Sequence, residues 1–450
     1  MRRAEPGLPF IPPYYQPWVR WVIQVLLPWW LRRRLHITQV RVEGARALVP
    51  WYQALQQNQA RVLLAFRHPT LDDPYVMFYL LAYAVPAAAR ALGVKLRLPV
   101  HNYFVYDRGI PLWAGRWVGW LFSRLGGIPI QRGRMDRLAI KTIREVLVRG
   151  EMPLTVAPEG GINGQSERVA PLEPGVVQMG FWCLEDLAKQ GQEMPVVVIP
   201  IGIQYGYVHP PWAKVGELLT RMETLGGLPV PKEVPGTTEQ HAWLYGRWLR
   251  LVDALLTEMT DFYARFYHCP PPSLPPAVAE RVQTQLAHLQ DRALQVAEAF
   301  FGVAGEGTPI ERCRRLEAIG RDWLYRQDWP DLSPLARHLA DQLAQETAGR
   351  LWHMQLVERL TSVAVDYVQE KRSADRLAEV TLMLWSVVNH LQGKEQPVHL
   401  GERWVAVRVG EPIRLNDSWE TYRRNRKSAR EVVNQVTALL AARLQGLIQT

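Results

Sequence analysis

Residues 61–73 read Arg-Val-Leu-Leu-Ala-Phe-Arg-His-Pro-Thr-Leu-Asp-Asp, and this stretch joins a strand signal to a group of ionisable side chains. Its first six residues are mostly apolar and the run breaks at Arg-His-Pro, which predicts a short buried strand over residues 61–66. A helical pattern of apolar residues follows from Pro74. A buried strand that leads into a helix is the repeating unit of α/β proteins.

Further along the chain the same pattern recurs. Residues 135–148 carry apolar residues at helical spacing, and short apolar or alternating runs predict further strands at residues 94–100, 128–130, 152–157, 195–203 and 404–409. Strands that alternate with helices predict an α/β fold whose sheet is mainly parallel and is flanked by helices on both faces.

A long helical block separates the last strand from the others. Residues 241–391 are almost wholly helical in pattern, with breaks at the proline cluster 270–276 and at 302–309. About 190 residues pass without a comparable strand signal, which is far more than an ordinary connection. We therefore expect a large all-α insertion in one α/β domain. The predicted segments are an N-terminal segment at 1–36, the first part of the domain at 37–206, the insertion at 207–400 and the second part at 401–450.

Composition excludes two broad classes of protein and leaves several partners open. Of the 450 residues 48% are hydrophobic, which excludes a disordered chain, and the 3 isolated cysteines exclude a disulfide scaffold and a cysteine-based zinc site. Isolated cysteines also favour a reducing compartment. The net charge of +10 favours an anionic partner, which can be a membrane surface, a phosphorylated substrate, an acidic carrier protein or a nucleic acid.

The N-terminal run at residues 18–31 is rich in tryptophan and leads into the cluster Arg32, Arg33 and Arg34. A spanning helix needs about 20 apolar residues. This run is shorter and contains Arg20, Gln24 and Pro28, and no small-residue cleavage site follows it, so we expect neither a membrane span nor a signal peptide. Aromatic rings beside arginines are typical of a helix that lies in the headgroup region. The alternative is an aromatic helix that packs on the protein's own core. We expect a peripheral protein on the cytoplasmic face of a membrane, bound to an anionic surface.

His68 stands at the end of the predicted strand, five residues before Asp73. The structural alternative is that Asp73 and Pro74 simply begin a helix and that His68 is an ordinary loop residue. In a catalytic interpretation, a neutral imidazole removes the proton of a substrate hydroxyl as its oxygen attacks an acyl carbonyl. A carboxylate on the far nitrogen fixes the tautomer and stabilises the imidazolium. This pair includes no protein nucleophile, so it suits direct acyl transfer to an alcohol.

Three further motifs follow predicted strands or lie within one. They are Gly126 to Arg132, then Pro158-Glu159-Gly160-Gly161, and then Ile199-Pro200. Together with His68 and Asp73, and in this order, they resemble the four motifs of the glycerolipid acyltransferase family, which includes 1-acylglycerol-3-phosphate acyltransferases. The resemblance covers about residues 37–205 and 404–448 and leaves the helical block unaccounted for.

The resemblance implies a glycerolipid acyltransferase fold and a role for each motif. His68 is implied to be the general base and Asp73 the residue that orients it, while Arg132 is implied to hold the acceptor's phosphate. Glu159, Gly160 and Gly161 are implied to shape the acceptor site. The implied donor is a thioester on acyl-carrier protein or coenzyme A, and the implied acceptor is lysophosphatidic acid or a related glycerolipid. The predicted reaction requires no metal and no cofactor.

The third motif departs from the pattern of many members that accept a phosphate. Where those members continue Thr-Arg-Ser after Glu-Gly, this chain has Gly161, Ile162 and Asn163, so one phosphate ligand is missing. Arg134 or Arg168 are candidates to replace it. We expect acylation of 1-acylglycerol-3-phosphate to phosphatidic acid. The alternatives are a lysophospholipid or glycerol-3-phosphate acyltransferase and, from a different class, a non-catalytic membrane-surface scaffold with the same fold.

Two rival functions find little support in the sequence. The basic residues are dispersed apart from Arg32–Arg34 and residues 423–427, and no zinc-finger spacing, RNA-recognition signature or basic-zipper pattern occurs, so we expect no nucleic-acid partner. The Gly-x-Ser-x-Gly motif of many hydrolases is also absent from the sequence.

Overall fold

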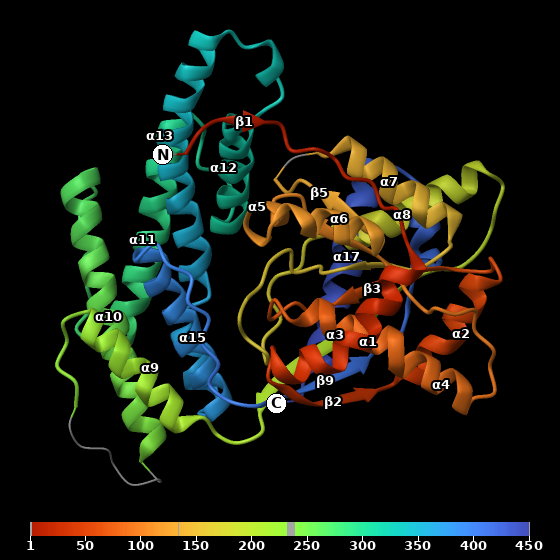
Figure 1. Cartoon of the computed structure of the whole chain (residues 1–450), viewed down its shortest axis with the longest axis horizontal. Coiled ribbons are helices and arrows are strands. Elements are labelled where there is room, and N and C mark those ends of the chain that lie inside the picture. Colours follow the sequence, from red (N-terminus) through yellow and green to blue (C-terminus); the bar gives the residue numbers. More distant parts are fainter. Residues whose placement is uncertain (1, 134, 232–238, 450) are drawn as a thin grey trace. The chain divides into compact units, whose positions relative to one another are not determined.

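The computed structural model describes residues 2–133, 135–231 and 239–449, which divide into two compact units (Figure 1). The α/β unit comprises Phe10–Gln131, Asp136–Val208 and Glu402–Thr450. The helical unit comprises Met1–Pro9, Arg132–Met135 and His209–Gly401. The expected N-terminal segment 1–36 is thus divided between the two units, and a short piece after residue 131 belongs to the helical unit.

One mixed sheet of eight strands forms the centre of the α/β unit within the described residues. The strand order is β2-β9-β7-β3-β6-β4-β5, and β10 pairs with β7. Only the pairs of β7 with β9 and with β10 are antiparallel among the described strands, which confirms the expected mainly parallel sheet. The strands are β2 (Ile37–Glu43), β3 (Arg61–Phe66), β4 (Tyr103–Asp107), β5 (Gly127–Ile130), β6 (Leu154–Val156), β7 (Val196–Tyr207), β9 (Arg403–Val409) and β10 (Ile413–Arg414).

Helices cover both faces of this sheet because the strand residues alternate between two apolar clusters. From β3, Leu64 and Phe66 face a cluster made with α1 (Pro17–Arg33), α2 (Ala45–Gln56), α3 (Asp73–Tyr79) and α4 (Val85–Ala91). Leu63 and Ala65 face the opposite cluster, made with α7 (Arg137–Arg149), α8 (Gly175–Lys189) and α17 (Arg426–Gly446). All six residues of β3 are buried, as the apolar run predicted.

The strand predicted at residues 94–100 is wrong, since this stretch has no regular structure and the strand β4 begins at Tyr103. Leu98 is exposed and Pro99 has no N–H to donate to a ladder, whereas β4 consists of aromatic and β-branched residues with an Asp at its end. Strand β2 was not predicted. The apolar pattern that begins at Pro74 is also divided, because a π-helical turn, Leu80–Ala84, lies between α3 and α4.

The helical unit contains α9 (Trp212–Leu225), α10 (Gln240–Tyr267), α11 (Val278–Phe301), α12 (Pro309–Leu324), α13 (Pro334–Thr361), α14 (Val365–Glu370) and α15 (Ala374–Leu391). The breaks after α10 and α11 agree with the predicted breaks at 270–276 and 302–309, whereas the ends of α12, α13 and α14 were not predicted. Gly302 adopts a left-handed conformation after α11, and Thr308 with Glu311 forms a capping box that begins α12. A two-stranded pairing of β1 (Glu5–Pro6) with β8 (Tyr325–Arg326) was not predicted.

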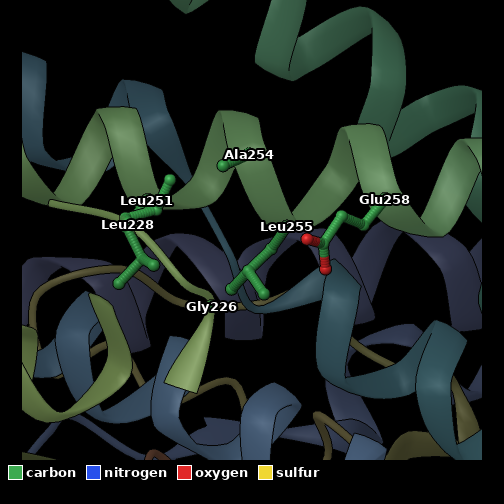
Figure 2. Close-up of a pocket in the computed structure, with 6 residues that line it drawn as sticks. All are labelled: Gly226, Leu228, Leu251, Ala254, Leu255 and Glu258. Carbon is green, nitrogen blue, oxygen red and sulfur yellow. The ribbon is translucent and has the colours of Figure 1, made fainter. Parts of the chain in front are cut away.

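A shallow hollow in the helical unit lies beside α10 (Figure 2). Aliphatic groups and the carboxylate of Glu258 line it, with Gly226, Leu228, Leu251, Ala254 and Leu255 as the other lining residues. This set contains no histidine, serine or cysteine side chain. Among the described residues, no helix combines the length and the apolar character that crossing a bilayer requires.

Candidate active site

His68 and Asp73 meet just beyond the end of β3. Nδ1 of His68 lies 2.9 Å from Oδ2 of Asp73, and the Asp73 side chain is fully buried while the His68 side chain is 19% exposed. Helix α3 does begin at Asp73, as the structural alternative predicted, but its N-cap residue is Asp72, which makes no side-chain capping bond. The Asp73 carboxylate is directed to His68 and Thr70 instead. A carboxylate acceptor at Nδ1 places the proton there and leaves Nε2 as the basic nitrogen. Within the described part of the chain, Nε2 has no hydrogen-bond partner.

Asp73 receives three more donors besides the imidazole, and the weakest is the Thr70 hydroxyl, 3.5 Å from Oδ1. The backbone N–H of Thr70 donates to Oδ2 at 2.9 Å, and the hydroxyl of Tyr205 donates to Oδ1 at 2.6 Å. Burial, together with the negative charge of Asp73, raises the pKa of Tyr205 well above its ordinary value, so this phenol stays protonated and acts as a donor. These donors therefore hold the carboxylate in a fixed orientation.

Tyr205 reaches this position because β7 extends beyond β3. Phe66, the last residue of β3, pairs with Ile201, so Tyr205 lies four residues further along β7. That extension is paired on its other side with β9, where Tyr205 lies opposite Val405. The strand that returns after the helical insertion thus supports the part of β7 beside the dyad.

Arg403 at the start of β9 supports the site indirectly, through Asp72 and Tyr205. Its guanidinium donates to Oδ2 of Asp72 at 2.5 Å and to the carbonyl of Leu35 at 2.7 Å. It also lies 5.4 Å from the centre of the Tyr205 ring. Burial alone would lower the pKa of Arg403, but the Asp72 carboxylate raises it above its ordinary value. Arg403 therefore stays charged and fixes the turn that carries Asp72 and Asp73.

Glu159 is buried beside His68, and its carboxylate is occupied by protein groups. Oε1 accepts the backbone N–H of His68 at 2.8 Å, and Oε2 accepts the N–H of Ala170 at 2.8 Å and the amide of Asn163 at 3.3 Å. Its exposed fraction is 4%. In this structure Glu159 joins the backbone of His68 to the loop after β6, so it shapes the site as a positioning residue.

Arg67, the residue before His68, also binds this loop. Its side chain is fully buried, with Nε 3.6 Å from Oε1 of Glu159. The guanidinium donates to the carbonyl oxygens of Ser166 at 2.7 Å, Gln165 at 3.0 Å and Arg168 at 2.6 Å. Residues 157–174 contain no helix or strand, and a loop of that length in a compact domain is usually functional. Arg67 and Glu159 together bind it to the end of β3.

Gly160 and Gly161 form the bend that follows Glu159. Gly160 has φ of +64° and its N–H donates to the carbonyl of Ala157 at 3.3 Å, so the chain turns tightly at the end of β6. A side chain at this position would be strained. The glycine of the third motif is therefore required by the backbone.

Arg132 lies in a different setting from the other predicted site residues. It follows β5, and two strands separate β5 from β3, so the ends of these strands are about 14 Å apart at the usual spacing. Arg132 itself belongs to the helical unit, where burial and then its charge lower the pKa of Arg314 in α12. A Cβ on the adjacent Gly133, whose φ is +80°, would collide with the carbonyl oxygen of Arg314. The phosphate role of Arg132 stays a prediction, and Arg134 lies outside the described residues.

One group of possible metal ligands occurs among the described residues, also in the helical unit. It consists of Cys313, Glu317 and Glu358, whose ligand atoms lie within 4.8 Å of one another. Burial, followed by the two carboxylates, raises the pKa of the Cys313 thiol well above its ordinary value, so the thiol is protonated. The cluster lies in the helical unit and contains none of the residues of the His68–Asp73 dyad.

Sequence reasoning identified His68, Asp73, Glu159 and Gly160, which the structure brings together, but it missed Tyr205, Arg403 and Arg67. A signal for Tyr205 was present in the strand periodicity. Alternate residues of β7, namely Val197, Ile199, Ile201, Ile203 and Tyr205, lie in the same apolar cluster as Phe66. Because side chains alternate between the two faces of a strand, this pattern from Val197 onward would have placed Tyr205 on the same face of the sheet as Phe66, two residues before His68.

Comparison with known proteins agrees with this geometry. Residues 39–204 match the family model described as Acyltransferase, and this range includes the dyad and the loop after β6. No curated protein and no solved structure matches the chain. Residues 39–204 are therefore a domain of the glycerolipid acyltransferase family, and the mixed, mostly parallel sheet of the α/β unit is consistent with that fold.

Proposed function

We propose that this acyltransferase domain moves a fatty acyl group from a thioester, on acyl-carrier protein or coenzyme A, to the free hydroxyl of 1-acylglycerol-3-phosphate, which yields phosphatidic acid. The observation that carries the proposal is the dyad. Nδ1 of His68 is held at 2.9 Å by a buried Asp73, and the ring remains partly open to solvent. General bases for a hydroxyl group are built in this way.

In the proposed reaction, Nε2 of His68 removes the proton of the acceptor hydroxyl as its oxygen attacks the thioester carbonyl. The new C–O bond forms a tetrahedral intermediate, and its collapse breaks the C–S bond. The imidazolium then returns the proton to the leaving thiolate, so the enzyme ends in its starting state. Asp73 stabilises the imidazolium, and the donors from Thr70 and Tyr205 keep the carboxylate in line with Nδ1.

A phosphate on the acceptor is supported by the basic character of the chain and by the second motif. Arg132 is our candidate ligand, since a planar guanidinium binds a phosphate monoester with two hydrogen bonds. Asn163, which replaces a residue of the usual Thr-Arg-Ser stretch, uses its amide on Glu159 and on the carbonyl of Arg168 at 2.7 Å. The amide of Asn163 therefore braces the loop and does not replace the missing phosphate ligand. This favours a lysophospholipid, whose phosphate is a diester, as the second candidate acceptor.

We also propose that the domain works at an anionic membrane surface through α1. Trp18, Trp21 and Trp29 are 58%, 44% and 56% exposed, so these rings do not pack into the protein core. Arg32, Arg33 and Arg34 follow at the end of the helix and are exposed. Such a helix fits the headgroup region of a bilayer that contains anionic lipid.

A matrix of acceptors and donors tests the proposed reaction. Lysophosphatidic acid, lysophospholipids and glycerol-3-phosphate would each be incubated with an acyl thioester of coenzyme A and of acyl-carrier protein. We expect phosphatidic acid as the main product and a loss of about 10²–10⁴-fold in rate for His68→Ala. The exposed His209, which lies outside the site, provides the control His209→Ala with unchanged rates. Wild-type rates in His68→Ala would refute the catalytic assignment.

A further inference from the structure

We propose that α5 (Ile110–Ala114) and α6 (Arg116–Arg124) join α1 in a single docking surface for an anionic lipid bilayer. This inference rests on the proposed function in one respect, because it supposes that the substrates lie in a membrane. The new element is the pair α5–α6, which has no part in the dyad and none in the four motifs.

The two segments that carry α1, α5 and α6 are basic and contain no acidic residue. Residues 10–34 and 108–131 contain no Asp and no Glu, although the whole chain carries 43 acidic residues in 450. The first segment contributes Arg32, Arg33 and Arg34, and the second contributes Arg116, all of them exposed. A surface with arginines and no carboxylate matches an anionic headgroup layer.

The polarity of α1 is inverted relative to that of a helix on a water-soluble surface. Its outward stripe consists of Trp18, Trp21, Val22, Val25, Leu26 and Trp29, which are all exposed. The polar side chains in the middle of the helix, Arg20 and Gln24, point inward, and the exposed arginines stand only at its end. Arg20 is 2% exposed and donates to the carbonyl of Val100 at 2.9 Å, and the amide of Gln24 lies beside it. Surface helices in water show the opposite arrangement, so the outward stripe requires an apolar partner.

The helices α5 and α6 show the same exposure of large aromatic side chains. Trp113 and Trp117 are each 64% exposed, Trp120 is 46% exposed and Leu112 is 41% exposed. The inward residues of α6 are small or aliphatic, namely Val118, Gly119 and Ser123. Tryptophan beside arginine is the residue combination found at the boundary between lipid headgroups and acyl chains.

Hydrogen bonds fix the start of α1 to the end of α6. The N–H groups of Tyr14 and Gln16 donate to the carbonyls of Ser123 and Arg124, both at 2.8 Å. The Ser123 hydroxyl donates to the carbonyl of Pro12 at 2.7 Å. The guanidinium of Arg124 lies 4.8 Å from the Tyr14 ring centre and 5.5 Å from that of Trp120. The two aromatic segments therefore form one connected piece of the α/β unit.

Flotation with lipid vesicles tests this surface in the full-length protein. Vesicles of phosphatidylcholine with a quarter of phosphatidylglycerol would be compared with vesicles of phosphatidylcholine alone. We expect the triple variant Trp113→Ala/Trp117→Ala/Trp120→Ala to lower partitioning onto the anionic vesicles at least tenfold, although α1 is intact. The matched control is Leu335→Ala/Leu339→Ala on α13, whose side chains are 73% and 64% exposed, and it should change partitioning less than twofold.

A single charge reversal, Arg116→Glu, gives a second variant that removes no apolar group. It should weaken binding to anionic vesicles and leave binding to neutral vesicles unchanged. If the triple variant and Arg116→Glu both bind anionic vesicles as the wild type does, α5–α6 is not part of the surface. Equal binding of the wild type to neutral and anionic vesicles would refute the claim that the surface prefers anionic lipid.

Turnover of a short-chain acceptor that is monomeric in water separates this inference from the proposed function. We expect the triple variant to keep wild-type turnover of that acceptor and to lose turnover of the same headgroup embedded in vesicles. If the wild type floats with anionic vesicles but transfers no acyl group to any acceptor, the proposed function fails and the docking surface stands. If it transfers acyl groups but does not float, the surface fails alone.

Discussion

The hydroxyl of Tyr205 lies 2.6 Å from Oδ1 of Asp73, the carboxylate whose other oxygen lies 2.9 Å from Nδ1 of His68. This contact joins residues 132 positions apart in the chain. It makes the dyad the end of a longer hydrogen-bond chain, in which a protonated phenol partly neutralises the carboxylate that holds the imidazole.

Tyr205→Phe removes that donor and leaves more negative charge on the oxygens of Asp73. The imidazolium is then held more tightly and loses its proton at a higher pH, so the acid limb of the profile of kcat/KM against pH should move to higher pH. The raised pKa of Tyr205 means that the phenol itself adds no alkaline limb below about pH 10.

A pH profile of each variant checks this prediction. Tyr103→Phe is the matched control, since the Tyr103 hydroxyl is also bonded to a carboxylate, that of Glu151 at 2.8 Å, away from the dyad. It should leave the profile unchanged. A profile of Tyr205→Phe that overlays the wild-type curve would show that the phenol does not act on the dyad.

The buried pair of Arg67 and Glu159 should control the stability of the loop at 157–174. Arg67→Met leaves the Glu159 charge without its cation and removes the donors to three carbonyl oxygens, so we expect a loss of about 3–5 kcal/mol in the free energy of unfolding. Arg67→Lys should recover only part of it, because lysine lacks the planar fork. Denaturant unfolding measures both.

The exposed pair of Arg423 and Glu420 is the control for that experiment, with side chains 60% and 68% exposed. Arg423→Met should cost less than about 1 kcal/mol, as exposed pairs do. Glu159→Gln can still accept the N–H of His68, so the double variant with Arg67→Met should be less destabilised than the two single losses added together. Simple additivity would argue that the two side chains act independently.

The order of the elements was largely predictable from the sequence, whereas the contacts that build the site were not. The apolar run of β3 and the proline and glycine breaks of the helical block are local signals, and both appear where they were predicted. The bonds of Tyr205 to Asp73 and of Arg403 to Asp72 join positions far apart in the chain, so only the strand register creates them. Glu159 was expected to shape the acceptor site, but its bonds to the backbone N–H groups of His68 and Ala170 could not be read from the sequence.

Gly160→Ala should reduce activity more than its effect on stability would suggest. Gly160 has φ of +64°, and alanine in this conformation costs about 1–2 kcal/mol. Gly191 has φ of +66°, has open space around its Cβ position and lies after α8, away from the dyad. Gly191→Ala should therefore lower the melting temperature similarly and leave kcat/KM unchanged. Equal activity of the two variants would show that the bend after Glu159 does not contribute to the active site.

Arg132→Ala tests whether the acceptor's phosphate is bound after β5. Loss of a bidentate guanidinium–phosphate contact should cost about 1.5–3 kcal/mol, which is roughly a 10- to 150-fold loss in kcat/KM for lysophosphatidic acid. The KM for the thioester should not change, and an acceptor that lacks a phosphate should be used as by the wild type. Arg137→Ala, at the exposed start of α7, controls for the loss of a nearby positive charge. If Arg132→Ala and Arg137→Ala behave alike, or if both acceptors lose rate equally, then Arg132 contributes general charge or structure, and the phosphate must bind elsewhere.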